Sequence, residues 1–202
     1  MLKGATVHSR VLALRGIVEG QLAGPHPGLA RAVKFAAFVS LTAAAAQFAV
    51  RLPFTPVPVT MQTLFVVLAG VTLGARDGFF AMLAYVAIGF AGAPVFAEFS
   101  GGPHVLLGPT GGYLVAFPAA ALVAGYVSAG LGGGRLSVLA ASFCGMALVL
   151  LSGASYLALI SGLSFARSAS LAVFPFVAGD IVKAFVASLL AGSCLASRRG
   201  IL

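Results

Sequence analysis

The fold is decided by an apolar run near the C-terminal end of the chain, residues 171–196, which reads LAVFPFVAGDIVKAFVASLLAGSCLA. This run is long enough to cross a lipid bilayer as one helix, because about 20 apolar residues suffice. Asp180 and Lys183 lie inside it, and on a helix their spacing puts both side chains on one face. Each charge near the bilayer centre costs roughly 2.5–3.5 kcal/mol. The pair is therefore either an ion pair that satisfies itself or a polar group that faces a cavity and meets a ligand.

The rest of the chain is similarly apolar. Of its 202 residues, 60% are hydrophobic and only 8% are charged, whereas about a quarter of residues are charged in soluble domains. We therefore expect an integral membrane protein in contact with lipid. The formal net charge of +8 does not indicate a nucleic-acid partner, because the basic residues lie mainly at the ends of apolar runs, where they determine topology.

The apolar runs predict an all-α membrane protein, a compact bundle of six transmembrane helices with structured extracellular loops. The second and third runs are short, since helices of roughly 15 residues reach about 23 Å and the hydrocarbon core is ~30 Å thick. Irregular chain must then complete the crossing, and it must be buried in protein or line a cavity. The predicted spans are residues 29–50, 60–75, 78–92, 112–131, 136–161 and 169–196.

Two regions are predicted from this pattern. Residues 1–28 form a cytoplasmic N-terminal segment whose apolar positions share one face of a helix, so we expect it to lie on the membrane surface. Residues 29–202 form the membrane domain. Basic residues place both termini in the cytoplasm by the positive-inside rule, because two basic residues, Arg51 and Arg167, fall on the other side against nine on this one: Lys3, Arg10, Arg15, Arg31, Lys34, Arg76, Arg135, Arg198 and Arg199.

The outward-facing loops have unusual sequences. Residues 51–60 read RLPFTPVPVT, with three prolines that make the chain extended and stiff, and we expect this apolar stretch to pack down as a lid. Residues 92–113 are rich in glycine and proline. This loop is either a convoluted connector or a backbone that approaches a ligand closely and offers it the amides at the start of the fourth helix.

Four motifs together resemble one family. They are LPFTPVPVTMQT at residues 52–63, GFAGAPVF at 89–96, GPTGGY at 108–113 and GDIVK at 179–183. The chain resembles BioY, the biotin-specific substrate-binding (S) subunit of energy-coupling-factor transporters, and the agreement extends from about residue 29 to residue 197. It departs from the pattern at Ala93, where a bulkier residue is expected, and at Glu98, where the loop is more often neutral.

The resemblance implies high-affinity binding of biotin from outside the bacterial cytoplasmic membrane. It also implies two kinds of partner, a transmembrane coupling subunit and two cytoplasmic ATPases. In the binding site, Lys183 pairs with the carboxylate of biotin and Asp180 accepts hydrogen bonds from its urea N–H groups; alternatively, Asp180 mainly orients Lys183. The other expected ligand contacts are Phe54, Tyr85 and Tyr113 for the ring, and Thr110, Gly111, Gly112 and Gln62 for polar groups.

The source of energy and the docking surface are also predicted. The sequence has no GxxxxGK[ST] phosphate loop, so ATP would be used by a partner. Small residues spaced four apart on the first span, Ala32, Ala36 and Ser40, would let another helix approach closely in lipid. They form a docking face for the coupling subunit or, equally, a packing face within the bundle.

Two other functions are open to this sequence. An ion-coupled carrier of a small carboxylate vitamin would use Asp180 and Lys183 as a relay, although no inverted repeat of broken helices is evident. A membrane enzyme would need a nucleophile such as Ser152, Ser155 or Thr110, but no GxSxG motif is present. We expect no enzyme activity. We also expect no cofactor and no metal, because the cysteines and histidines are scattered: Cys144, Cys194, His8, His26 and His104.

Overall fold

The computed structural model describes residues 27–199 of the chain. The chain falls into two compact units, Met1–Lys34 and Phe35–Leu202, and each is described by itself. The described part of the first unit is the beginning of helix α2 (Pro27–Gln47). Apart from its last two residues, the predicted surface helix over residues 1–28 lies outside the described part of the chain.

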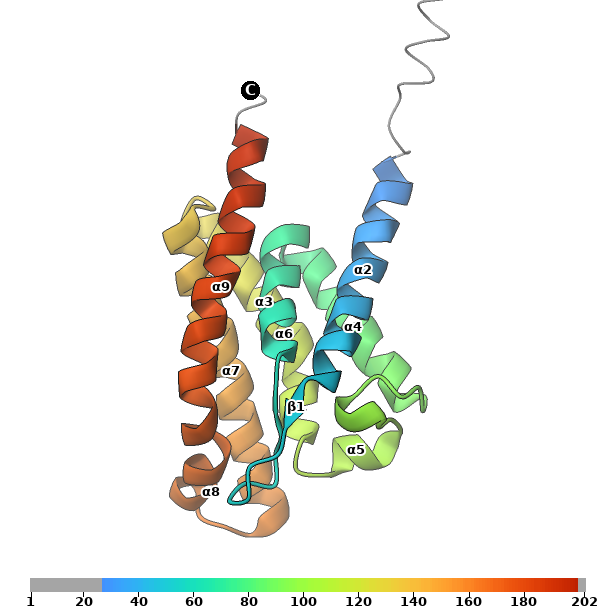
Figure 1. The fold of residues 1–202 in the computed structure, drawn as a ribbon, viewed down its shortest axis with the longest axis vertical. Coiled ribbons are helices and arrows are strands. Elements are labelled where there is room, and N and C mark those ends of the chain that lie inside the picture. Colours follow the sequence, from blue (N-terminus) through green and yellow to red (C-terminus); the bar gives the residue numbers. More distant parts are fainter. Residues whose placement is uncertain (1–26, 200–202) are drawn as a thin grey trace, which may run out of the picture. The chain divides into compact units, whose positions relative to one another are not determined.

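The second unit is built from helices, and a helix occurs in each of the six predicted apolar runs (Figure 1). Besides the end of α2, the long helices of this unit are α3 (Gln62–Leu73), α4 (Ala75–Phe90), α6 (Gly111–Gly130), α7 (Arg135–Ser161) and α9 (Phe174–Arg199). Shorter helices are η1 (Ala97–Phe99), α5 (Pro103–Leu107) and α8 (Phe165–Ala172).

The last predicted run is wrong in one respect, because it is two helices rather than one. Helix α8 ends before Val173, whose backbone leaves the helical conformation at φ −120° and ψ −58°. Pro175 lies in the first turn of α9, where its missing N–H group is tolerated. A proline there cannot continue a helix from α8, since it has no N–H group to donate to the preceding turn.

The helices identify a multi-pass membrane protein. Among the described residues, four helices are long and apolar enough to cross a bilayer: Gly28–Gln47, Gly111–Gly130, Arg135–Ser161 and Phe174–Ala191. The predicted shortness of the second and third helices is confirmed, since α3 has 12 residues and α4 has 16. Crossing by all six runs stays a prediction.

Helices α3, α4 and α6 pack with their backbones in direct proximity. A Cβ atom placed on Gly70 of α3 would lie 2.0 Å from the carbonyl oxygen of Ala121 on α6. Small residues of this kind are what let helices approach closely in lipid. The fully buried side chains of Val66, Met82 and Tyr85 fill the space around this contact, so the short helices are anchored in the interior of the unit.

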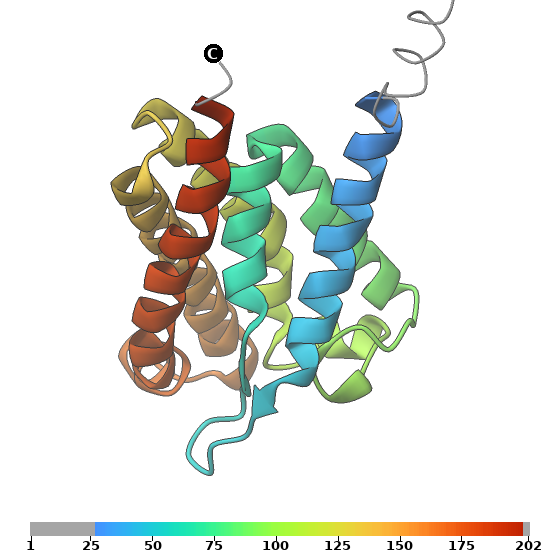
Figure 2. The same cartoon turned by 45° about the horizontal axis from the view of Figure 1, so that its top comes forward.

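Irregular chain gathers at one end of the second unit (Figures 1 and 2). Strands β1 (Ala49–Val50) and β2 (Val59–Thr60) pair antiparallel, with Ala49 opposite Thr60, so residues 51–58 form a hairpin loop. Helices α5 and α8 lie at this same end, whereas the α3–α4 and α6–α7 connections lie at the other. Apart from this ladder and a single bridge between Phe96 and Ser100, the regular structure of the described residues is helical, as predicted.

Candidate ligand-binding site

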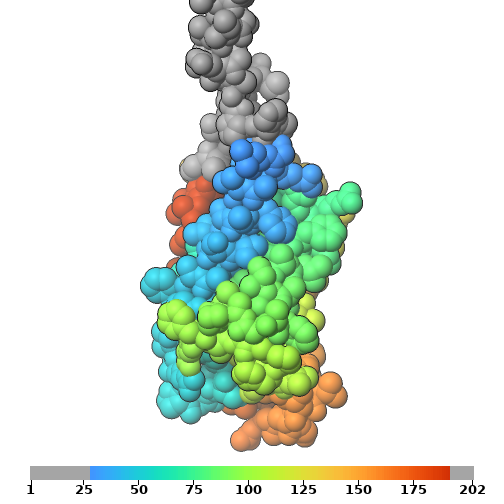
Figure 3. Space-filling view, turned by 90° about the vertical axis from the view of Figure 1, so that its right-hand side faces the viewer, coloured from blue at the N-terminus to red at the C-terminus, as the bar shows by residue number. Residues whose placement is uncertain are grey.

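A cavity of about 700 Å³ lies at the end of the second unit where the loops gather. Ligand sites are usually clefts of about 300–1,000 Å³. Its walls come from the 51–60 hairpin, residues 96–105 and helices α3, α6, α7 and α9. In the space-filling view of Figure 3, the cyan hairpin lies against the yellow-green segment that follows α4. The expected lid therefore forms part of the cavity wall.

The polar group predicted from the GDIVK motif lies in this wall. Lys183 Nζ is 2.9 Å from Asp180 Oδ1, and both side chains are buried, with exposed fractions of 5% and 7%. Thr63 on α3 links the two, because its hydroxyl accepts from Lys183 Nζ at 3.1 Å and donates to Asp180 Oδ1 at 3.2 Å. The spacing on α9 puts both charges on the face that meets the first turn of α3.

This group of three residues is not fully satisfied. Asp180 Oδ2 is buried and accepts no hydrogen bond from any of the described residues. Lys183 has three N–H donors, of which the hydrogen bonds to Asp180 and Thr63 use two. Leaving a buried acceptor unpaired costs about 1–3 kcal/mol. Among the described residues, the pair thus leaves one acceptor, Asp180 Oδ2, and one donor of Lys183 without a partner, side by side in the cavity wall.

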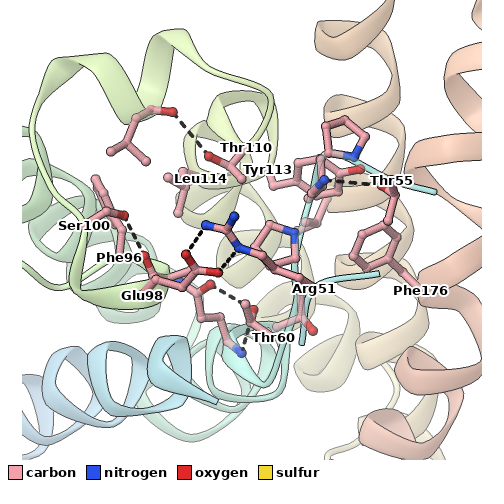
Figure 4. Close-up of a pocket in the computed structure, with 18 of the residues that line it drawn as sticks. Arg51, Thr55, Thr60, Phe96, Glu98, Ser100, Thr110, Tyr113, Leu114 and Phe176 are labelled. Atoms are coloured by element: carbon pink, nitrogen blue, oxygen red, sulfur yellow. Dashed lines mark hydrogen bonds and ion pairs between the residues drawn. The ribbon is translucent and has the colours of Figure 1, made fainter. Parts of the chain in front are cut away.

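Aromatic and aliphatic side chains form the apolar part of the wall. The rings of Tyr113 and Phe176 lie 5.8 Å apart, centroid to centroid, and Figure 4 shows both at the cavity with Leu114 nearby. The Tyr113 hydroxyl donates to the carbonyl of Ala172 at 2.6 Å, so its polar atom has a partner and its ring can contact a ligand. Gly153 makes room for that ring, since a Cβ there would lie 2.3 Å from it.

Gln62 lies in the wall and Tyr85 lies behind it. The Gln62 side chain donates to the Tyr85 hydroxyl at 2.6 Å and accepts from the Thr60 hydroxyl at 2.9 Å. Tyr85 in turn donates to the carbonyl of Val95 at 2.8 Å, and its side chain is fully buried outside the cavity lining. Tyr85 thus fixes the orientation of Gln62 and does not itself face the cavity.

Three other predicted contacts are not in the wall. Phe54 is 59% exposed at the hairpin. Gly111 and Gly112 serve helix packing, because a Cβ on Gly111 would lie 1.8 Å from the Leu106 carbonyl oxygen and one on Gly112 would lie 2.3 Å from Tyr156 Cβ. The amide of Gly111 donates to Gly108 at 3.0 Å, so it is not offered to a ligand as expected.

Two of the three residues considered for the enzyme alternative donate hydrogen bonds to backbone carbonyls. Ser152 donates to the carbonyl of Gly112 at 2.8 Å, which ties α7 to α6. Thr110 lies in the cavity wall, where its hydroxyl donates to Val105 at 3.3 Å. Ser155 is exposed on α7. These contacts favour a binding site over an activated nucleophile.

A second ion pair lies at the cavity, and the sequence prediction missed it. Two nitrogens of Arg51, in the hairpin, donate to the two carboxylate oxygens of Glu98, in η1, and the two side chains face one another in Figure 4. The hydrogen bonds from Arg51 lower the pKa of Glu98, and those to Glu98 raise the pKa of Arg51. Glu98 is the one acid in the predicted outward loops, which was the available signal that it has a basic partner.

The segment that holds Glu98 is strained. Glu98 has φ 59° and ψ 38°, and Phe99 has φ 56°. This left-handed conformation costs about 1–2 kcal/mol per residue for side chains other than glycine. Such backbone persists where surrounding contacts determine it, and it concentrates at functional sites.

The comparisons with known proteins agree on one family. The model of the BioY family matches residues 19–199. The chain is 45% identical over 156 residues to a protein of Pyrococcus horikoshii named as a probable biotin transporter BioY, which covers 77% of this chain and 90% of the relative. It is 37% identical over 152 residues to the biotin transporter BioY of Thermotoga maritima, which covers 70% of this chain and 83% of the relative.

A solved structure has the same fold. The crystal structure of the S-component for biotin from an ECF-type ABC transporter superposes with a TM-score of 0.78, covering 84% of this chain and 92% of that one. At 22% sequence identity, this likeness establishes the fold.

Proposed function

Because the chain belongs to the BioY family, we propose that it binds biotin with high affinity and is the substrate-binding subunit for biotin uptake across the cytoplasmic membrane. The observation that carries the proposal is the Asp180 oxygen that has no hydrogen-bond partner among the described residues and lies beside Lys183 in the cavity wall. A neutral urea with N–H donors and a carbonyl acceptor complements this group.

The observed geometry favours one orientation of biotin. The urea and the carboxylate are at opposite ends of biotin, whereas the charged atoms of Asp180 and Lys183 are 2.9 Å apart. This distance argues against one biotin molecule filling both roles expected from the sequence, with its urea at Asp180 and its carboxylate at Lys183. A carboxylate at Lys183 would also be buried beside the Asp180 carboxylate, which like-charge repulsion opposes.

In our proposal, the urea lies at Asp180 and Lys183. Asp180 Oδ2 accepts a urea N–H group, and the free donor of Lys183 reaches the urea carbonyl. Tyr113 and Phe176 contact the fused rings, and Gln62 and Thr110 are further polar contacts. The valeryl carboxylate is then directed away from the pair toward water at the cavity mouth.

The proposal includes the membrane topology and the partners. Six helices cross the membrane, the cavity mouth faces outward, and both termini are cytoplasmic. Arg76 and Arg135 support this orientation, because they follow the α3–α4 and α6–α7 connections at the end opposite the hairpin. The chain joins a transmembrane coupling subunit and two ATPases, and α2 is the proposed contact, since Ala32, Ala36 and Ser40 are all exposed.

Binding of labelled vitamins to the purified protein tests the function. We expect saturable one-to-one binding of biotin, and no competition from thiamine or riboflavin at a large excess. Competition by those vitamins, or the absence of saturable biotin binding by folded protein, would contradict the proposal.

A further inference from the structure

The last residue of α2 holds the strained turn next to the cavity. Gln47 Nε2 donates to the carbonyl of Phe96 at 3.1 Å, and Gln47 Oε1 accepts from the amide of Phe99 at 2.9 Å. One side-chain amide thus binds the backbone on both sides of Ala97 and Glu98. A third hydrogen bond, to the carbonyl of Ala43 at 3.1 Å, fixes this amide to its own helix.

The turn needs such contacts, since its conformation is unfavourable by itself. Glu98 and Phe99 both have positive φ, which side chains other than glycine rarely adopt. The internal hydrogen bonds of the turn involve Ser100, whose amide and hydroxyl both donate to the carbonyl of Ala97, at 3.2 and 2.7 Å. The two hydrogen bonds of Gln47 tie the backbone of the turn to α2.

Arg51 is four residues beyond Gln47, on the same segment. The segment from Gln47 to Arg51 therefore contacts the turn in two places. Gln47 binds the backbone of the turn, and Arg51 binds the Glu98 carboxylate. Arg51 and Glu98 both line the cavity and come from two different parts of its wall, the hairpin and the segment after α4. Joining them restrains the hairpin relative to that segment.

We propose that Arg51 and Glu98 form a latch at the cavity mouth, and that Gln47 is the positioning residue that holds Glu98 in the latched conformation. The latch sets the rate at which biotin enters and leaves, and this inference rests on the proposed function of the cavity. The ion pair is well suited to repeated opening, because its side chains are 79% and 39% exposed and exposed pairs are weak.

Rates of binding and release of labelled biotin test the latch in purified protein. Glu98→Gln keeps the shape and removes the charge, so both rates should rise by about twofold to fivefold, the range for an exposed ion pair, with a smaller change in Kd. Gln47→Met should act in the same direction. Arg167→Gln, which alters an exposed arginine outside the cavity lining, is the matched control and should leave both rates unchanged.

Two double variants test whether Gln47 acts by positioning Glu98 and whether Arg51 acts through its ion pair with Glu98. If Gln47 acts through Glu98, the Gln47→Met, Glu98→Gln double variant should be no faster than Glu98→Gln alone. The exchange of charges, Arg51→Glu with Glu98→Arg, should restore slow rates, which a direct contact of Arg51 with biotin would not allow. Additive rates in the double variant, or fast rates in the exchanged one, would overturn the proposal.

A measurement without ligand keeps the latch distinct from the function of the cavity. A spin label at the exposed position 54, attached after Phe54→Cys in a background with Cys144→Ala and Cys194→Ala, reports hairpin mobility. Glu98→Gln and Gln47→Met should both increase this mobility. Unchanged mobility would overturn the latch, whereas increased mobility in a protein that fails to bind biotin would support the latch and contradict the proposed ligand.

Discussion

The cavity is lined by two acid–base pairs that have the same chemistry and different surroundings. Asp180 and Lys183 are three residues apart on α9, and their side chains are 7% and 5% exposed. Arg51 and Glu98 come from separate loops, and their side chains are 79% and 39% exposed. A hydrogen bond from a ligand to a buried charged group is worth about 1.5–3 kcal/mol, whereas an exposed ion pair contributes little and is screened by salt. We therefore propose that the buried pair determines the affinity for biotin and that the exposed pair determines the rates at which biotin binds and is released.

The largest expected effect is at the buried pair. Lys183→Met keeps length and removes the charge, so it should weaken biotin binding about tenfold to a hundredfold, given that a hydrogen bond to a charged group is worth about 1.5–3 kcal/mol. If Lys183 meets the urea, biotin amide should be weakened by the same factor as biotin. If Lys183→Met weakens the binding of biotin but not of biotin amide, Lys183 instead pairs with the biotin carboxylate. Calorimetry with both ligands decides between these outcomes.

A smaller effect is expected at Thr63. Thr63→Val preserves shape and removes the hydroxyl that bridges Lys183 and Asp180. Because Thr63 acts on biotin only through this pair, Kd should rise by roughly twofold to tenfold, less than after loss of a charged hydrogen bond to the ligand itself. Thr72→Val is the matched control, because the hydrogen bond of that hydroxyl among the described residues stays within α3, to the carbonyl of Leu68. Equal losses in the two variants would mean that the bridge has no particular role in binding.

The exposed pair should be distinguished by its salt dependence. Raising the salt from about 0.1 to 1 M shortens the Debye length from about 10 to 3 Å, so biotin release by the wild type should accelerate. Release by Glu98→Gln should respond less, because its latch has no ion pair to screen. The same salt response in both proteins would contradict the assignment of kinetics to this pair.

The smallest effects on binding are expected away from both pairs. Ala36→Leu should leave Kd unchanged and reduce co-purification with a coupling subunit, because a bulky side chain would hold two helices apart. Normal assembly of Ala36→Leu would mean that the docking face lies on another surface.

Phe54→Ala should change the Kd for biotin by less than about twofold, since Phe54 is exposed and outside the cavity wall.

What the sequence predicted well depends on local spacing. Asp180 and Lys183 are brought together by helical periodicity alone, and the apolar runs located the helices. The break at Val173 was also encoded locally, in Pro175, but hydropathy does not register it. Contacts between distant segments were not accessible in this way. Gln62 and Tyr85 are both expected ligand contacts, and only Gln62 lies in the cavity wall. Which of the two faces the cavity depends on how α3 packs on α4.

The Arg51–Glu98 pair is a second contact between distant segments that local spacing in the sequence does not predict. Arg51 and Glu98 are separated by 47 positions, and they meet because two residues other than glycine adopt positive φ. The residue types at positions 98 and 99 do not predict positive φ, because glycine is the residue that commonly adopts it. Glycines at positions 111 and 112 predict close backbone approach, but the groups that approach them belong to the neighbouring helices α5 and α7.

The central claim is that the buried pair is a ligand site, and Asp180→Asn tests it most directly. Thermal stability of the ligand-free variant in detergent and its Kd for biotin are measured together. If Asp180 serves the ligand, the variant should fold with little loss of stability and bind biotin about tenfold to a hundredfold more weakly. If the pair only satisfies itself, the variant should lose the 3–5 kcal/mol that breaking a buried pair costs and bind biotin normally where it remains folded, which would contradict the account.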